Sequence, residues 1–274
     1  MRTIIALLKR NLLKLVRNRM RLFMNLFMSA IFLFIFSFIM KSTGVGLENP
    51  MNYLIAGIII MTVFQSSMNN SMNILDDITG GFMKEILVAP VARWQIAVGH
   101  VLSSTVISVI QGFIIVVIGF FMGFSLSLLS GLGMIIVMIL VGLTFSAMGL
   151  FLATVTREST NFQLLVTIVS FPLTFLSGAY IPTMVLPKVL LPIVYINPLT
   201  YATALFRYIT LGMDKLPVDQ LVSSGVAFKI NGWVISPWLS SVFILLICVL
   251  FFFLCVNRFS KADFSNIKTF SHRR

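Results

Sequence analysis

Six long apolar runs dominate this sequence and limit its fold more than any other feature. A helix needs about 20 mostly apolar residues to cross the hydrocarbon core of a bilayer. Runs of this kind cover residues 22–40, 51–75, 96–122, 126–155, 162–180 and 237–257. We therefore predict an all-α, polytopic membrane protein with six transmembrane helices, in which residues 1–274 form a single transmembrane domain.

Composition excludes the main soluble classes. Hydrophobic residues make up 58% of the chain and charged residues 10%, against about 25% charged residues in an ordinary soluble domain. A soluble fold of this length could not hide so much apolar surface, which excludes a soluble enzyme, a disordered chain and a disulfide scaffold. The net charge of +12 comes from basic residues beside the apolar runs. This placement indicates contact with membrane lipid, and we expect no nucleic-acid partner.

The basic residues also predict the topology. Six spans place both termini on one side, and with the N-terminus inside, 15 of the 20 Lys and Arg residues are cytoplasmic. This excess satisfies the positive-inside rule, so we expect both termini in the cytoplasm. For residues 1–20 we predict a basic amphipathic helix at the inner interface, or alternatively a plain basic flank. For residues 258–274 we predict a cytoplasmic tail.

The long segment 181–236 on the outer side contains five prolines but stays apolar between them. Proline interrupts helices, so we predict short helices that lie on the outer leaflet or re-enter it.

Several chemistries lack the residues they need. The middles of the spans contain no Asp, Glu, Lys or Arg, which argues against ion-coupled transport. The dipeptide Gly-Lys is absent, so the chain has no P-loop for ATP. We expect no catalytic residue, no metal site and no cofactor bound by this chain, and any ATP and Mg²⁺ would be held by a partner.

Two spans carry rows of polar residues at helical spacing. The row in the second span consists of Thr62, Ser66, Asn69 and Asn73. The row in the fifth span consists of Gln163, Thr167, Ser170, Thr174 and Ser177, with Phe171 and Phe175 beside it. Neither row should face acyl chains. One interpretation is a substrate pathway, and the other is hydrogen bonding between packed helices.

The loop at residues 80–94 alternates charged and apolar residues until Pro90 interrupts the run. This pattern predicts a short amphipathic helix that contacts a cytoplasmic partner, or alternatively an ordinary interfacial loop.

Three segments resemble the membrane subunits of ABC-2 type exporters, most closely the daunorubicin-resistance subgroup. The first runs from Lys84 to Arg93. The second joins Phe171-Pro172 to Ser177-Gly178, Pro182 and Pro187. The third joins Asn197-Pro198 to Thr200-Tyr201 and Arg207. The sequence departs from the family pattern at Ala89, where Ser or Thr is common.

The resemblance implies roles for these parts. A coupling helix would dock on a separate ATP-binding subunit, present in two copies, through Lys84, Glu85, Ile86, Leu87, Val88, Pro90 and Arg93. The N-terminal helix would be the elbow helix. An extracellular gate would include Gly178, Tyr180, Pro182 and Pro187. A second permease copy, identical or a paralogue, would complete a pathway between the second and fifth spans.

The expected function is export of a hydrophobic or amphipathic drug, antibiotic or lipid across a bacterial plasma membrane. The alternative cargo is a polysaccharide or lipid-linked glycan. A passive channel or a membrane scaffold without an ATPase partner is the alternative from another class.

Overall fold

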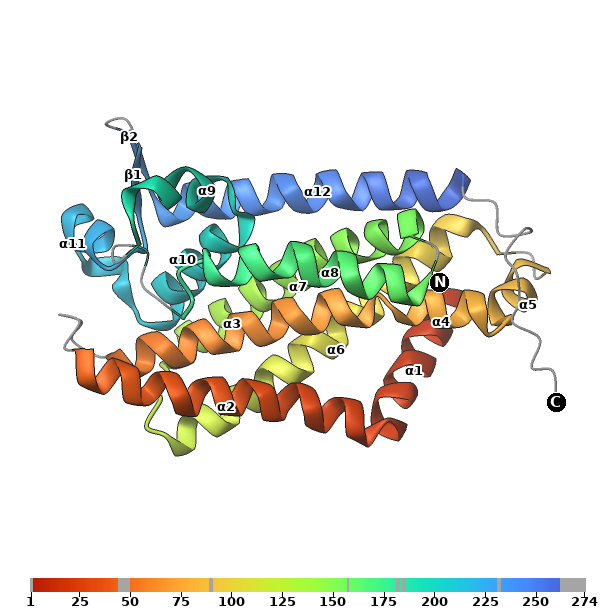
Figure 1. Ribbon diagram of the computed structural model, residues 1–274, viewed down its shortest axis with the longest axis horizontal. Helices are drawn as coiled ribbons and strands as arrows, with labels where there is room; N and C mark the ends of the chain where they lie inside the picture. The colour runs from red at the N-terminus through yellow and green to blue at the C-terminus, as the bar shows by residue number, and fades with distance from the viewer. Residues whose placement is uncertain are drawn as a thin grey trace.

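The computed structural model describes residues 2–43, 50–88, 91–156, 158–180, 183, 186–230 and 233–261. Its long helices run roughly along one axis of the molecule (Figure 1). They are α2 (Arg19–Thr43), α3 (Pro50–Asn70), α6 (Arg93–Phe121), α7 (Leu128–Thr156), α8 (Ser159–Phe175) and α12 (Pro237–Lys261). The all-α, polytopic class predicted from the sequence is confirmed.

Helix length and composition identify fewer spans than the six apolar runs of the sequence. Within the described residues, four helical segments are long and apolar enough to cross a membrane, namely α3 with its continuation, α6, α7 and α12. A fifth candidate joins α2 to α1 (Arg2–Arg17) across a 70° bend. Helix α8 is apolar but has only 17 residues. The count of six spans therefore stays a prediction.

Short elements gather at the two ends of the bundle (Figure 1). One end holds α1, α4 (Asn73–Thr79) and α5 (Phe82–Val88), and we name it the inner end after the predicted topology. The other, named the outer end in the same way, holds α9 (Leu191–Ile196), α10 (Pro198–Thr210), α11 (Val218–Ser223) and the 3₁₀ turns Lys188–Leu190 and Met213–Lys215.

The outer segment is not purely helical, which corrects the prediction for residues 181–236. Strands β1 (Phe228–Ile230) and β2 (Trp233–Ile235) form an antiparallel pair with Lys229 opposite Val234. Aromatic and β-branched residues favour strands over helices, and they fill most positions of this pair.

Helix α3 is the centre of the core and packs against α2, α6 and α7. Small residues allow the close approach of its neighbours. A Cβ at Gly112 of α6 would lie 2.5 Å from Val63, and one at Gly149 of α7 would lie 2.6 Å from the Ser71 hydroxyl. Helix α12 buries little of its apolar surface, which leaves it facing outward.

The second predicted span is broken near its end. Helix α3 ends at Asn70, the chain turns at Ser71 and Met72, and α4 follows. The Ser71 hydroxyl donates to the backbone oxygen of Ser146 on α7 at 3.1 Å. This contact holds the turn against α7, and Pro50–Thr79 as a whole is still long and apolar enough to cross a membrane.

A buried arginine helps to attach the outer segment to the bundle. Arg207 on α10 is buried. Its guanidinium donates to three backbone oxygens, those of Tyr53, Gly178 and Ala179, at 3.2, 2.9 and 2.7 Å. It also lies 3.4 Å from the centre of the Tyr53 ring. Gly57 leaves room for this contact, because a Cβ there would lie 2.3 Å from the Ala179 oxygen.

We expect Arg207→Met to lower the free energy of unfolding by about 2–4 kcal/mol, because three buried carbonyls lose a charged donor. Thermal unfolding of the detergent-solubilised protein measures this change. Lys215→Met is the matched control, since Lys215 is an exposed cation of the same outer segment. Equal melting temperatures for the two variants would contradict the role given to Arg207.

Candidate functional site: the inner end of the bundle and its polar helices

The predicted short helix near the second span is present as α5. Met83 is buried in the core, and Ile86 packs against it. Glu85 is exposed, and Val88 exposes 88% of its surface. One face of α5 is therefore exposed, and its opposite face packs against the bundle. Pro90 and the side chains of Lys84 and Leu87 lie outside the described residues.

A buried carboxylate joins α5 to the rest of the bundle. Asp77 on α4 is 2% exposed and accepts hydrogen bonds from Arg10 and from Lys14, the latter at 2.7 Å. The His100 ring of α6 lies 3.6 Å from the other carboxylate oxygen. Arg10 also lies 4.0 Å from the centre of the Phe82 ring on α5. We call Asp77, Arg10, Lys14 and His100 the inner charge cluster.

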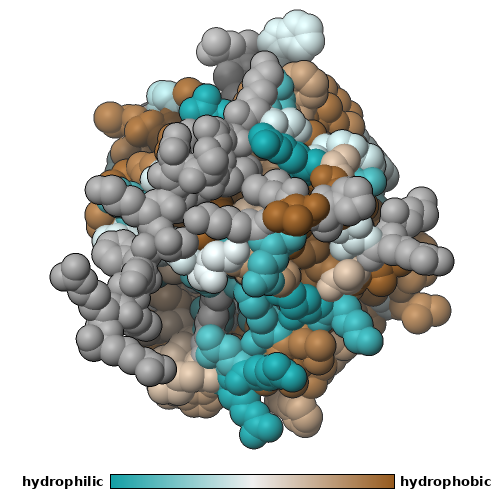
Figure 2. Space-filling view, turned by 90° about the vertical axis from the view of Figure 1, so that its right-hand side faces the viewer, coloured by the Kyte–Doolittle hydropathy of each residue, from teal (hydrophilic) through white to brown (hydrophobic). Residues whose placement is uncertain are grey.

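The N-terminal helix packs on α6 as well as on α4. Leu7 is buried beside Gly99 of α6, where a Cβ would lie 2.8 Å from the leucine side chain. The Asn11 amide donates to the Ser103 hydroxyl at 2.7 Å. Figure 2 shows hydrophilic side chains gathered in a band on this end of the molecule, with hydrophobic ones on both sides. The helix is thus a fixed part of the bundle rather than only a lipid-facing element.

The polar row of the second span does not stay together. Thr62, Ser66 and Asn69 on α3 line a cavity next to α2. Asn73 lies beyond the turn at Ser71 and lines a different cavity with Asn11. The turn at Ser71 and Met72 separates Asn73 from the other three residues, and the role of the row as a substrate pathway stays a prediction.

The row in the fifth span is divided by exposure. Ser170, Thr174 and Ser177 are buried, and the Thr174 hydroxyl accepts from Gln65 of α3 at 3.4 Å. The other members of the row, and the two phenylalanines beside it, are exposed on α8: Gln163, Thr167, Phe171 and Phe175. One half of the row packs inside the subunit, and the other half faces outward.

The predicted gate residues occupy the outer end of α8. The backbone oxygen of Gly178 binds Arg207, and φ at Gly178 is +80°, a conformation that side chains other than glycine rarely adopt. The Tyr180 ring stacks on Phe32 and Phe36 of α2 at 5.1 and 5.0 Å. Pro187 is exposed at the start of a 3₁₀ turn. Pro182 lies outside the described residues.

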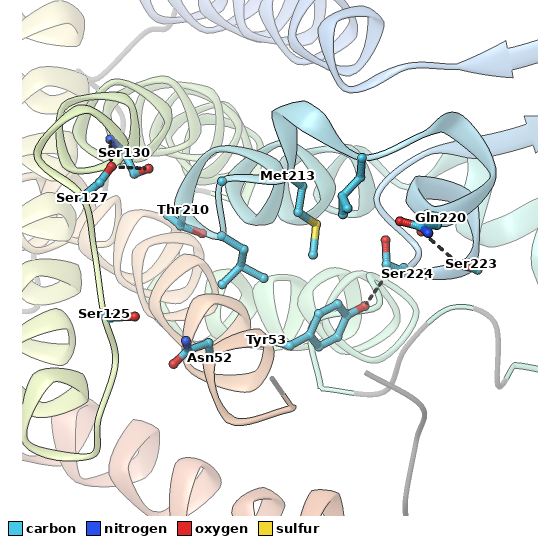
Figure 3. A pocket seen from close by; sticks show the side chains of 13 residues that line it. Asn52, Tyr53, Ser125, Ser127, Ser130, Thr210, Met213, Gln220, Ser223 and Ser224 are labelled. Carbon is cyan, nitrogen blue, oxygen red and sulfur yellow. Dashed lines mark hydrogen bonds between the residues drawn. The ribbon is translucent and has the colours of Figure 1, made fainter. Parts of the chain in front are cut away.

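A polar cavity of about 630 Å³ lies between the outer ends of α3, α7, α10 and α11. Asn52, Ser125, Ser127 and Gln220 point toward it (Figure 3). The Tyr53 hydroxyl donates to the Ser224 oxygen at 3.0 Å and closes one wall. Tyr53 therefore connects this cavity to the Arg207 contact.

Sequence reasoning missed Asp77, because it follows a similar Asp76 and no spacing distinguishes the two. Arg207 was noted only as part of the family resemblance, and its three backbone partners could not be predicted from the sequence. His100, which no motif of the sequence singles out, is buried beside Asp77.

We expect Asp77→Asn to destabilise the packing of α1 on the bundle, because two basic side chains would lose a buried anionic partner. Removal of one partner of such a pair destabilises by about 1–3 kcal/mol when the other partners are partly exposed. Amide hydrogen exchange of Arg2–Arg17 measures the effect. Asp219→Asn, at an exposed carboxylate of α11, is the control. Unchanged exchange of α1 in Asp77→Asn would refute the anchoring role of the cluster.

Comparison with known proteins identifies the family. The model of the ABC-2 type transporter family matches residues 2–211. A protein of Cyanophora paradoxa named as transport permease ycf38 is 28% identical over 213 residues, which cover 74% of this chain and 72% of the relative. Its namesake in Porphyra purpurea is 32% identical over 164 residues, 59% of this chain and 56% of the relative. The inner membrane transport permease YadH of Escherichia coli strain K12 is 28% identical over 192 residues, 67% of this chain and 73% of the relative. The chain belongs to the ABC-2 type transporter family.

Proposed function

We propose that this permease is the membrane subunit of an ATP-driven exporter for hydrophobic or amphipathic molecules. Two copies of a separate ATP-binding subunit would supply the energy, and a second permease copy would complete the pathway. The protein would lie in a bacterial plasma membrane with both termini in the cytoplasm. The observation that carries the proposal is the exposed helix α5, attached to the bundle through the inner charge cluster.

Helix α5 suits the transmission of motion from a cytoplasmic partner. Its exposed face is available for docking, whereas Met83 and the Arg10–Phe82 contact fix its other face. Asp77 then connects this base to α1 and α6. A movement of α5 would therefore shift several helices together, and ATP-driven closure of the partner subunits could bias their arrangement.

The exposed face of α8 supports a dimer. Gln163 and Thr167 are exposed together with Ile168 and Phe171, which exposes 63% of its surface. Polar side chains are unfavourable against acyl chains, so a second copy of the permease is the occupant we propose for this face. The pathway would then run between α3 and α8 of both copies.

The proposal requires a partner with a P-loop. Purification in gentle detergent followed by native mass spectrometry should recover the permease with an ATP-binding polypeptide. Reconstituted vesicles with that partner should export an amphipathic drug in the presence of ATP. Isolation without any ATPase would instead favour a passive channel or scaffold, and export of a glycan alone would identify the alternative cargo.

We expect Glu85→Ala and Arg93→Ala to reduce transport and substrate-stimulated ATP hydrolysis by about tenfold while membrane insertion is kept. Glu85 lies on the exposed face of α5, and Arg93 begins α6 and donates to the Ser260 oxygen at 3.2 Å. Lys229→Ala is the control, because Lys229 is an exposed charge on β1 at the opposite end. If both variants transport substrate at the rate of the control, the assignment of α5 as the docking element is wrong.

A further inference from the structure

A second polar cavity lies inside the subunit, between α2, α3 and α6 and below Tyr180. Its volume is about 280 Å³. Seven of its lining residues carry an amide or an aliphatic hydroxyl, and none of the described residues that line it is charged. The cavity shares Thr62, Ser66 and Asn69 with the polar row of the second span, and residues of α2 and α6 of the same copy complete its walls.

Gln111 of α6 is the unusual residue of this cavity. It is fully buried, and among the described residues neither its amide nitrogen nor its amide oxygen has a hydrogen-bond partner. An unpartnered buried amide costs about 1–3 kcal/mol, and native proteins rarely leave one without a reason. Gln111 therefore offers both a donor and an acceptor to a group that enters the cavity.

The surrounding helices hold Gln111 in place. Gly112, the next residue, lies so close to α3 that a Cβ would be 2.5 Å from Val63. On the opposite wall the Thr62 hydroxyl donates to Ser29 of α2 at 2.9 Å. A hydroxyl oxygen that donates can still accept a further hydrogen bond, so the hydroxyls of this wall can bind a group that enters the cavity.

The opening of the cavity has an apolar part on α2. Met28 lines it and exposes 56% of its surface, and the Phe32 ring stacks on Tyr180 beside it. The other half-buried lining residues are polar, namely Asn25, Ser29, Gln65 and Asn69. An occupant would thus place a polar group near Gln111 and an apolar chain along the exposed face of α2.

We propose that this cavity binds the uncharged, hydrogen-bonding headgroup of an amphipathic molecule, with Gln111 as its anchor. The lack of charge in the lining disfavours an ionic headgroup, since a buried charge without a partner is costly. The volume corresponds to about nine water molecules at about 30 Å³ each, which suits a headgroup between glycerol and a hexose in size. The molecule could be a transported substrate or a resident lipid, and the substrate case rests on the proposed function.

Binding of two matched probes to the permease–ATPase complex in nanodiscs tests the inference. Both carry the same fluorescent dodecyl chain, one with a glucose headgroup and one with a trimethylammonium headgroup. We expect the wild-type complex to prefer the glucoside and Gln111→Leu to weaken glucoside binding about tenfold, because leucine fills the space without hydrogen bonds. Gln111→Glu should reverse the preference in favour of the ammonium probe.

Ser108→Ala is the matched control, because Ser108 is a buried polar residue of the same helix that faces Gly142 of α7. It should bind both probes as the wild type does. Equal affinity of Gln111→Leu and wild type for the glucoside, or no preference between the probes in the wild type, would show a cavity that holds only water and would overturn the proposal.

Vesicle assays then separate the two sources of the headgroup. A glucoside that stimulates ATP hydrolysis and accumulates in inside-out vesicles is a transported substrate. A glucoside that depends on Gln111 for binding but does neither occupies a lipid site. If no substrate is ever exported while Gln111-dependent binding persists, the proposed function fails and the headgroup site stands.

Discussion

The bilayer offers no water to buried polar groups, so most of them need a partner within the protein, and an amide without a partner among the described residues, such as that of Gln111, is costly. Two residues show how the fold meets this requirement, one on α4 and one on α10, helices that lie toward opposite ends of α3 (Figure 1). At one end Asp77 accepts from Arg10 and Lys14. At the other end Arg207 donates to three backbone oxygens. Each of these charges holds several segments together, and the apolar core lies between them.

These two attachments also connect the ends mechanically. Helix α3 has 21 residues, about 32 Å at 1.5 Å per residue. Tyr53 near its outer end contacts Arg207, and the turn at Ser71 beyond its inner end leads into α4 and α5. A helix of this kind can carry a displacement from one end of the bundle to the other, which agrees with the proposed drive by a separate ATP-binding subunit.

Much of the fold could be predicted because its signals are local. Apolar runs predicted the membrane class, and alternation of charged and apolar residues predicted the helix at α5. Helical spacing did not predict the turn at Ser71 and Met72, which separates Asn73 from Asn69. The Ser71 hydroxyl contacts both the Ser67 oxygen of α3 and the Ser146 oxygen of α7, and the second contact depends on tertiary packing.

The sequence by itself determined that this chain is an apolar, helical membrane protein without a P-loop, since composition and motif depend on residue order alone. Only the tertiary structure decided which polar residues face one another. It placed Asp77 beside the N-terminal helix, Arg207 against the end of α8, and Gln111 at an uncharged cavity. The physical reason is that a buried polar group is defined by its partners, and these partners lie 28 to 154 residues away for Arg207 and 63 to 67 residues away for two basic partners of Asp77.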